Sequence, residues 1–155
     1  MQRRTIWWGL ALAAAAAVVV AGVFATSRIG QDRGPSPERL ALGQRVYDEN
    51  CAACHGADLE GEPNWRARRA DGTLPAPPHD ETGHTWHHPD TQLFAITKQG
   101  TAAFAPEGYK TTMLGFGAVL GDEEIGAVLD YIKSRWPDDI RLRQAQASAR
   151  AGGAD

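Results

Sequence analysis

Cysteine and methionine are scarce in this sequence, which has two of each in 155 residues. Both cysteines, Cys51 and Cys54, lie close together, and a disulfide between them would close too small a loop to restrict the unfolded chain much. The sequence also lacks sustained alternating or β-branched runs, which predict strands. A thiol–disulfide redox site belongs beside a strand–helix–strand pattern, so this absence disfavours that function for the pair.

The two cysteines belong to the run Cys-Ala-Ala-Cys-His at residues 51–55. Cysteines at this spacing face one side over about one helical turn, where both sulfurs can form thioethers with the vinyl groups of one haem. The histidine that follows directs its imidazole at the iron. The motif therefore predicts one covalently attached haem c, bound through Cys51 and Cys54, with His55 as an axial ligand of the iron.

Structural zinc is an alternative that these residues leave open. Two thiolates and one imidazole need a fourth ligand, and the sequence has four further histidines, His79, His84, His87 and His88, that could supply it. These histidines could also bind a separate metal ion, although loop histidines are more often solvated or hydrogen-bonded. Their role stays open at this point.

The N-terminal segment carries no charged residue from Ile6 through Ala25. At about 1.5 Å per helical residue it reaches roughly 30 Å, the thickness of a bilayer core. Arg3 and Arg4 precede it, which predicts a cytoplasmic N-terminus and an exported remainder. We expect residues 1–25 to be a transmembrane anchor; the alternative is a cleaved signal peptide, whose apolar core is usually shorter. Both interpretations export the following chain, as haem c attachment in bacteria requires.

The exported part is expected to start with a flexible linker at residues 26–35, because these are mostly polar residues and glycine. Ser36 and Pro37 then supply a helix N-cap and a proline at the first helical position. They predict a helix to about residue 50. Residues 56–88 are rich in glycine, proline, charge and histidine, which predicts a long loop around the haem.

Two more helices are predicted beyond the loop. A short one begins at residues 89–90 and ends at Gly100, and a longer amphipathic one runs from residue 122 to Trp136, ahead of a proline. Residues 101–121 between them have no regular pattern. Residues 138–155 are expected to be a frayed or disordered tail without an assigned function.

Met113 is the candidate for the second axial ligand. Thioether sulfur favours ferrous iron in electron carriers, and the other methionine, Met1, lies on the cytoplasmic side of the predicted anchor. Gly115 and Gly117 follow Met113 and would let the backbone pass close to the porphyrin. The alternatives are that Met113 fills a gap in the core or that a loop histidine takes its place.

Further residues are candidates for the haem pocket. One carbonyl from Pro75, Pro77 or Pro78 could accept the other ring N–H of His55 and fix its tautomer. Tryptophan indoles could donate to a propionate, although packing explains a loop aromatic equally well. The predicted pocket residues are Pro77, Pro78, Trp86 and Tyr109.

Residues 36–137, about two-thirds of the chain, resemble a class I monohaem cytochrome c of the membrane-anchored bacterial type. The motif at residues 51–55 near the first helix and Met113 shortly before the last helix carry the resemblance, together with the stretch Tyr-Lys-Thr-Thr-Met-Leu-Gly-Phe at residues 109–116. It implies an all-α fold with about three to five helices around one haem, behind the transmembrane helix. The histidine- and tryptophan-rich residues 79–88 depart from the minimal family pattern.

The resemblance also implies that the first and last helices of the domain cross at right angles through a contact of small and aromatic residues. Gly43 and Tyr47, facing Val128 and Tyr131, match that expectation. The cytochrome c domain is then residues 36–137.

The expected function is one-electron transfer without catalytic residues or a small-molecule substrate, in a respiratory or photosynthetic chain. The family implies a membrane-bound quinol-oxidising donor and a terminal oxidase or reductase as acceptor. Without residues 1–25, which contain Arg3 and Arg4 and no acid, the chain has 14 basic and 19 acidic residues, a net charge of −5 that disfavours nucleic-acid binding and is compatible with a basic docking partner. The haem domain is expected in the periplasm, tethered to the inner membrane by a single span, or soluble there if residues 1–25 are cleaved. The alternative is a gas-binding sensor or small redox enzyme in which Met113 is displaceable.

Overall fold

The computed structural model describes residues 34–153. The predicted anchor at residues 1–25 and most of the predicted linker lie outside the described residues. Within residues 34–153, none of the helices combines the length and the apolar character needed to cross a membrane. The domain described below begins at Pro37.

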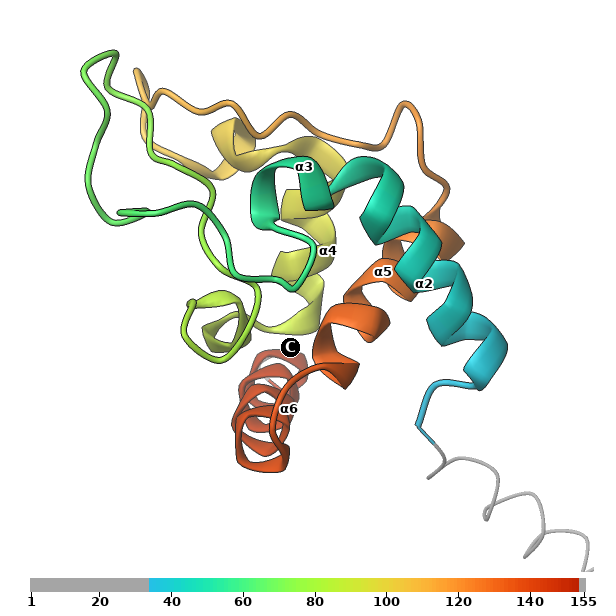
Figure 1. Ribbon diagram of the computed structural model, residues 1–155. Coiled ribbons are helices and arrows are strands. Elements are labelled where there is room, and N and C mark those ends of the chain that lie inside the picture. Colours follow the sequence, from blue (N-terminus) through green and yellow to red (C-terminus); the bar gives the residue numbers. More distant parts are fainter. Residues whose placement is uncertain (1–33, 154–155) are drawn as a thin grey trace, which may run out of the picture. The chain divides into compact units, whose positions relative to one another are not determined.

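Helices make up the regular structure of the described residues, as the sequence predicted. Their only strand-like feature is an isolated antiparallel bridge between Gly100 and Leu114. The α-helices are α2 (Pro37–Asn50), α3 (Ala52–His55), α4 (Asp90–Gln99), α5 (Asp122–Ser134) and α6 (Asp138–Gly152), with short 3₁₀ turns η1 (Thr85–His87) and η2 (Thr101–Phe104). Figure 1 shows long irregular segments between α3 and α4 and between α4 and α5.

The helix boundaries follow local sequence signals. Pro37 is the first residue of α2 and Glu38 lies in its first turn, where an acid interacts favourably with the helix dipole. Gly100 ends α4 with φ of 85°, a conformation that glycine adopts without strain. At the start of α5, the Glu124 carboxylate accepts a hydrogen bond from the Gly121 N–H at 2.8 Å. These starts and stops confirm the sequence-based assignments.

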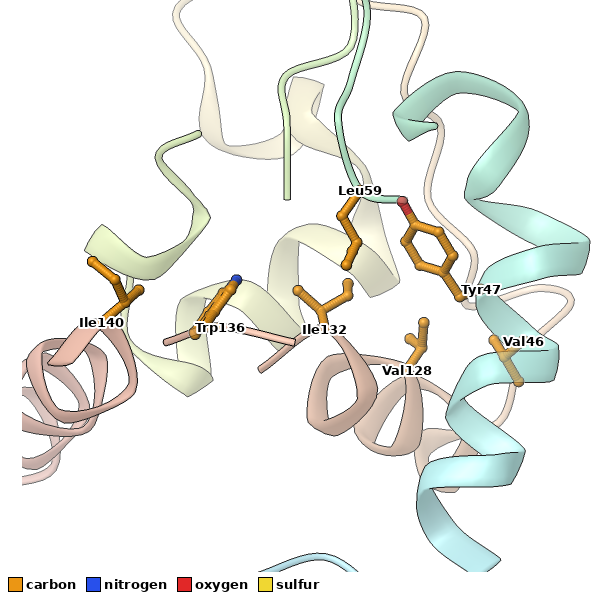
Figure 2. Close-up of a cluster of buried hydrophobic side chains, with 7 residues drawn as sticks. All are labelled: Val46, Tyr47, Leu59, Val128, Ile132, Trp136 and Ile140. Carbon is orange, nitrogen blue, oxygen red and sulfur yellow. The ribbon is translucent and has the colours of Figure 1, made fainter. Parts of the chain in front are cut away.

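The main core lies where α2 packs against α5. The backbone of Gly43 lies against Ala127 and Tyr131, and the rings of Tyr47 and Tyr131 are 5.6 Å apart. Val128 belongs to the same buried cluster as Tyr47. The predicted contact between the first and last helices of the cytochrome-like region is therefore confirmed. Figure 2 shows the cluster, which consists of Val46, Tyr47, Leu59, Val128, Ile132, Trp136 and Ile140.

A smaller buried cluster joins α4 to α5. It contains Leu93 of α4 with Ile125 and Leu129 of α5. Burying side chains of this size stabilises a fold by about 1.5–3 kcal/mol each. Helix α5 therefore holds α2 on one part of its surface and α4 on another.

Residues 138–152 differ from the frayed or disordered tail expected from the sequence, because they form α6 and belong to the same compact unit as the other helices. Ile140 and Gln144 of α6 are buried. The Gln144 amide donates to Asp90 Oδ1 at 2.7 Å, and the Asp90 N–H donates to Ser148 Oγ at 3.0 Å. These contacts fasten α6 to the start of α4, so the domain does not end at residue 137.

Candidate haem site

One helical turn places both cysteines. The N–H groups of Cys54 and His55 donate to the Cys51 carbonyl at 3.1 and 2.9 Å, which wraps residues 51–55 into a single turn. Both thiols are free; Cys51 is half-buried and Cys54 is exposed. Burial, and then the neighbouring Cys54, raise the pKa of the Cys51 thiol to about 11. The turn therefore presents two reduced sulfurs within reach of one ligand.

His55 is buried beside them, with 7% of its surface exposed. Its Nδ1 lies 2.8 Å from the Pro77 carbonyl oxygen. A carbonyl can only accept, so Nδ1 carries the proton and Nε2 keeps its lone pair. Burial lowers the pKa of His55, while the bond to Pro77 and the charge of Glu62 act in the opposite direction. The result is a neutral imidazole whose Nε2 has a free lone pair, and this is the form of histidine that ligates metals.

A hydrogen bond donated by His55 to the carbonyl of one of three prolines was predicted, and in the structure Pro77 is the acceptor. The loop that carries Pro77 is folded back on the motif by several contacts. The Gly61 N–H donates to the His55 carbonyl at 2.7 Å, and Glu62 pairs with Ala76 through backbone and side chain, the latter at 2.6 Å. The pairing of Ala76 with Glu62 therefore holds the residue directly before Pro77, whose carbonyl accepts the His55 proton.

Met113 is half-buried in the irregular segment before α5. Its N–H donates to Thr111 Oγ1 at 3.0 Å, and Thr111 Oγ1 lies 2.6 Å from Thr101 Oγ1 of η2. On the other side, Gly115 packs against the backbone of Gln99 at the end of α4. The structure thus fixes the segment on both sides of Met113. The structure records no contact between Met113 and His55; a haem bound at Cys51 and Cys54 would be needed to bring both to one iron.

The other predicted pocket residues take part in packing. Pro78 is buried in the loop. The Trp86 indole N–H donates to the Glu81 carbonyl at 3.3 Å, and its ring stacks on His87 at 3.6 Å. Tyr109 lies beneath the Arg68 guanidinium at 5.4 Å. Among the four pocket predictions, Pro77 is the residue with a recorded contact to His55.

His79 is a residue beside the motif whose contact the sequence reasoning missed. Its imidazole stacks on that of His55, with 3.9 Å between ring centroids and 20° between planes. No local pattern in the sequence marks this contact, because it depends on how the loop folds back through Glu62 and Ala76. The other histidines lie apart from His55: His84 stacks on Trp65 at 5.5 Å and packs edge-on against His88.

The zinc alternative and a separate metal site at the histidines both need several ligands gathered at one point. Residues 34–153 contain no group of three or more histidine, cysteine, aspartate or glutamate side chains placed to hold a metal ion. A covalently attached haem requires a different set of groups, namely two thiols on one turn and a buried neutral imidazole with its Nε2 free. Cys51, Cys54 and His55 fit that set.

Comparison with known proteins agrees with this geometry. The chain is 29% identical over 108 residues to the cbb3-type cytochrome c oxidase subunit FixP of Azorhizobium caulinodans. That match covers 67% of this chain and 33% of the relative, so the chain spans about a third of the relative's length. The Cytochrome c family matches residues 40–136, well over half of the chain. The protein is therefore a class I member of the cytochrome c family, with covalently bound haem c as its cofactor.

Proposed function

We propose that the protein is a membrane-tethered one-electron carrier in which Cys51 and Cys54 bind the haem and His55 and Met113 ligate its iron from opposite faces. The observation that carries the proposal is the Pro77 hydrogen bond, which leaves the Nε2 lone pair of a buried His55 free beside two reduced thiols. Membership of the cytochrome c family supports electron transfer rather than catalysis by this chain.

The side chains have separate tasks. The haem iron, when bound, supplies the one-electron couple. The thiols of Cys51 and Cys54 fix the position of the macrocycle, and the Pro77 carbonyl holds the His55 tautomer and orients its ring. The Met113 thioether is a soft ligand that favours the reduced state. With both His55 and Met113 as ligands, the iron would have no open position for a substrate.

The contacts of the Met113 segment favour a carrier over a gas sensor or redox enzyme. The bridge between Gly100 and Leu114, the Thr111 hydrogen bond and the packing of Gly115 hold the segment directly before and after Met113. A ligand on a backbone anchored so closely would not leave the iron readily. A displaceable Met113 would be expected on a loosely held loop.

A respiratory role and a location outside the cytoplasm complete the proposal. The relative in Azorhizobium caulinodans is named as an oxidase subunit, which supports a membrane-bound donor complex and a terminal oxidase or reductase as partners. The uncharged residues 6–25 support a single inner-membrane span with the haem domain in the periplasm. Tethering would raise the effective concentration of membrane-bound partners. Cleavage at residue 25 would instead give a soluble periplasmic carrier.

The haem and its ligands are tested on protein co-expressed with haem-maturation machinery. A haem stain should survive denaturing electrophoresis, and the ferric protein should show the weak far-red band of methionine-to-iron charge transfer. Met113→Ala should abolish that band, whereas Leu114→Ala, at a side chain that is 76% exposed, should keep it. Absence of the stain would refute haem attachment. Ready CO binding by the unmutated ferrous protein at neutral pH would instead favour the sensor or enzyme.

The tether is tested separately on the full chain. Intact mass of the mature protein distinguishes a retained N-terminus from one cleaved near residue 25. A retained span should keep the protein in the membrane fraction through salt and alkaline washes. Release by salt alone would contradict the tether and leave the electron-carrier proposal untouched.

A further inference from the structure

His79 lies in face-to-face contact with the residue that the motif assigns to the iron. The His79 and His55 rings are 3.9 Å apart at 20°, so the His79 imidazole covers one face of the His55 imidazole. The hydrogen bond to Pro77 restrains one atom of the His55 ring. The plane of the ring then depends on what lies against its faces, and His79 provides such a surface.

The His79 ring is itself held in place. Its Nδ1 lies 2.8 Å from Oγ1 of the buried Thr85. The edge of the ring packs against Tyr47, with 6.4 Å between centroids and 70° between planes. Tyr47 and Thr85 come from α2 and η1, so the ring is fixed from two parts of the fold.

The backbone of residue 79 is equally restrained. Its N–H donates to the Leu59 carbonyl at 2.8 Å, and its carbonyl accepts the indole N–H of Trp136 at 2.6 Å. Leu59 and Trp136 belong to the main buried cluster. These two bonds fix the backbone of residue 79 beside the core, so its side chain extends from a fixed point close to His55.

We propose that His79 is a positioning residue for the axial ligand, whose stacked ring sets the plane of the His55 imidazole and so the orientation of that ligand above the haem. The inference rests on the proposed ligation of the iron by His55. The orientation of an axial imidazole governs how unpaired spin is distributed over the haem in the ferric protein. The shifts of the four haem methyl protons report that distribution directly.

The test compares ring-retaining and ring-removing variants of the haem-bearing protein. His79→Phe keeps a flat side chain against His55, and His79→Asn keeps a polar group near Thr85 without the ring. We expect the four ferric methyl resonances to keep their wild-type order in His79→Phe and to change order or spacing in His79→Asn. His87→Asn is the matched control, because His87 is exposed and stacks on Trp86 rather than on His55; it should leave the resonances unchanged.

The outcomes separate this inference from the proposed function. A wild-type protein without a haem stain would overturn both. A haem-bearing His79→Asn protein with wild-type methyl shifts, or equal changes in His79→Phe and His79→Asn, would overturn the positioning role alone. If His79→Asn does not mature, Thr85→Val tests the same role, because it removes the hydrogen bond that fixes the His79 ring and should let that ring turn against His55, which should change the methyl shifts. Methyl shifts in Thr85→Val identical to those of the wild type would then refute the role.

Discussion

The backbone of Gly43 lies so close to Ala127 that a β-carbon on residue 43 would come within 2.7 Å of the Ala127 carbonyl carbon. The same β-carbon would lie 2.8 Å from Cβ of Tyr131. A neighbouring backbone cannot move aside as a flexible side chain can, so α2 and α5 approach at this distance because residue 43 has no side chain.

Replacing Gly43 with alanine should therefore destabilise the haem-bearing protein. Overpacking a well-packed contact costs about 1–3 kcal/mol, and the gain in helix propensity offsets at most about 1 kcal/mol of it. Urea denaturation followed by tryptophan fluorescence and haem absorbance measures the free energy of unfolding. Gly152→Ala is the control, because a β-carbon at that position of α6 meets nothing within 4 Å. Equal stability of the two variants would contradict the close approach of α2 and α5.

Gln144 tests whether α6 is part of the domain. Its buried amide donates to Asp90 Oδ1 at 2.7 Å and to the His88 carbonyl at 3.3 Å. Gln144→Ala removes both donors, and losing one partner of a part-buried hydrogen bond costs about 1–3 kcal/mol. Gln146→Ala, at an exposed position of the same helix, should change stability by less than about 0.5 kcal/mol.

Amide hydrogen exchange gives an independent measurement of the Gln144 effect. In Gln144→Ala, protection should fall in α6 and around residues 84–90, which α6 contacts through Gln144 and Ser148. Protection in α2 should stay at the wild-type level. A uniform loss over all helices would show that α6 does not open separately from the rest of the domain.

Local signals explain what the sequence could predict. The run at residues 51–55, the proline at the start of α2, the acids at the start of α5 and Gly100 at the end of α4 act over one or two helical turns. Structure that depends on interactions over one or two helical turns is determined by neighbouring residues, so the helices and the attachment motif could be identified from the sequence. The contact of Gly43 with α5 was predicted from the resemblance to class I cytochromes c, and the glycine by itself indicated only that another helix could approach closely.

Contacts between distant segments explain what was missed. The buried Gln144 amide donates to His88 and Asp90, which lie more than fifty positions earlier in the chain. Because the sequence near α6 does not show these acceptors, α6 was predicted to be a polar tail. The choice of Pro77 over Pro75 and Pro78 depends on how the loop returns through Glu62 and Ala76. The stacking of His79 on His55 also depends on how this loop folds back on the motif. No local pattern in the sequence specifies these pairings.

Glu62 gives a prediction on pH. The Ala76 N–H and the Arg69 guanidinium hold the pKa of the Glu62 carboxyl below its usual value. A carboxyl whose pKa is lower in the folded state stabilises the fold above its unfolded pKa, about 4.3, and that stabilisation disappears as pH falls through the lower folded value. Glu62→Gln should therefore cost stability at pH 7 and should approach the wild type below about pH 4.

The size of that effect is limited because the Glu62 and Arg69 side chains are 37% and 39% exposed. An ion pair at this exposure contributes at most about 1 kcal/mol. Denaturation midpoints of wild type and Glu62→Gln measured from pH 3 to pH 8 check it, and Glu107→Gln, at an exposed site on another loop, should track the wild type throughout. A stability difference between wild type and Glu62→Gln that is constant with pH would show that the carboxylate charge is not responsible.

Gly115 tests the link between the anchored segment and the proposed ligand Met113. A β-carbon on residue 115 would lie 2.5 Å from the Gln99 carbonyl carbon and 2.7 Å from the Lys98 carbonyl oxygen, so Gly115→Ala must push the segment away from the end of α4. If that displacement opposes ligation by about 1–3 kcal/mol, the fraction of protein without the methionine ligand rises roughly 5- to 150-fold. The far-red band should weaken and ferrous CO binding should become faster.

Gly121→Ala is the matched control, because its β-carbon would meet Glu124 at 3.7 Å, an ordinary contact. A far-red band of wild-type intensity in Gly115→Ala would mean that the packing of this segment on α4 does not hold Met113 on the iron. Contacts between the Met113 segment and the haem itself would then have to keep the methionine bound.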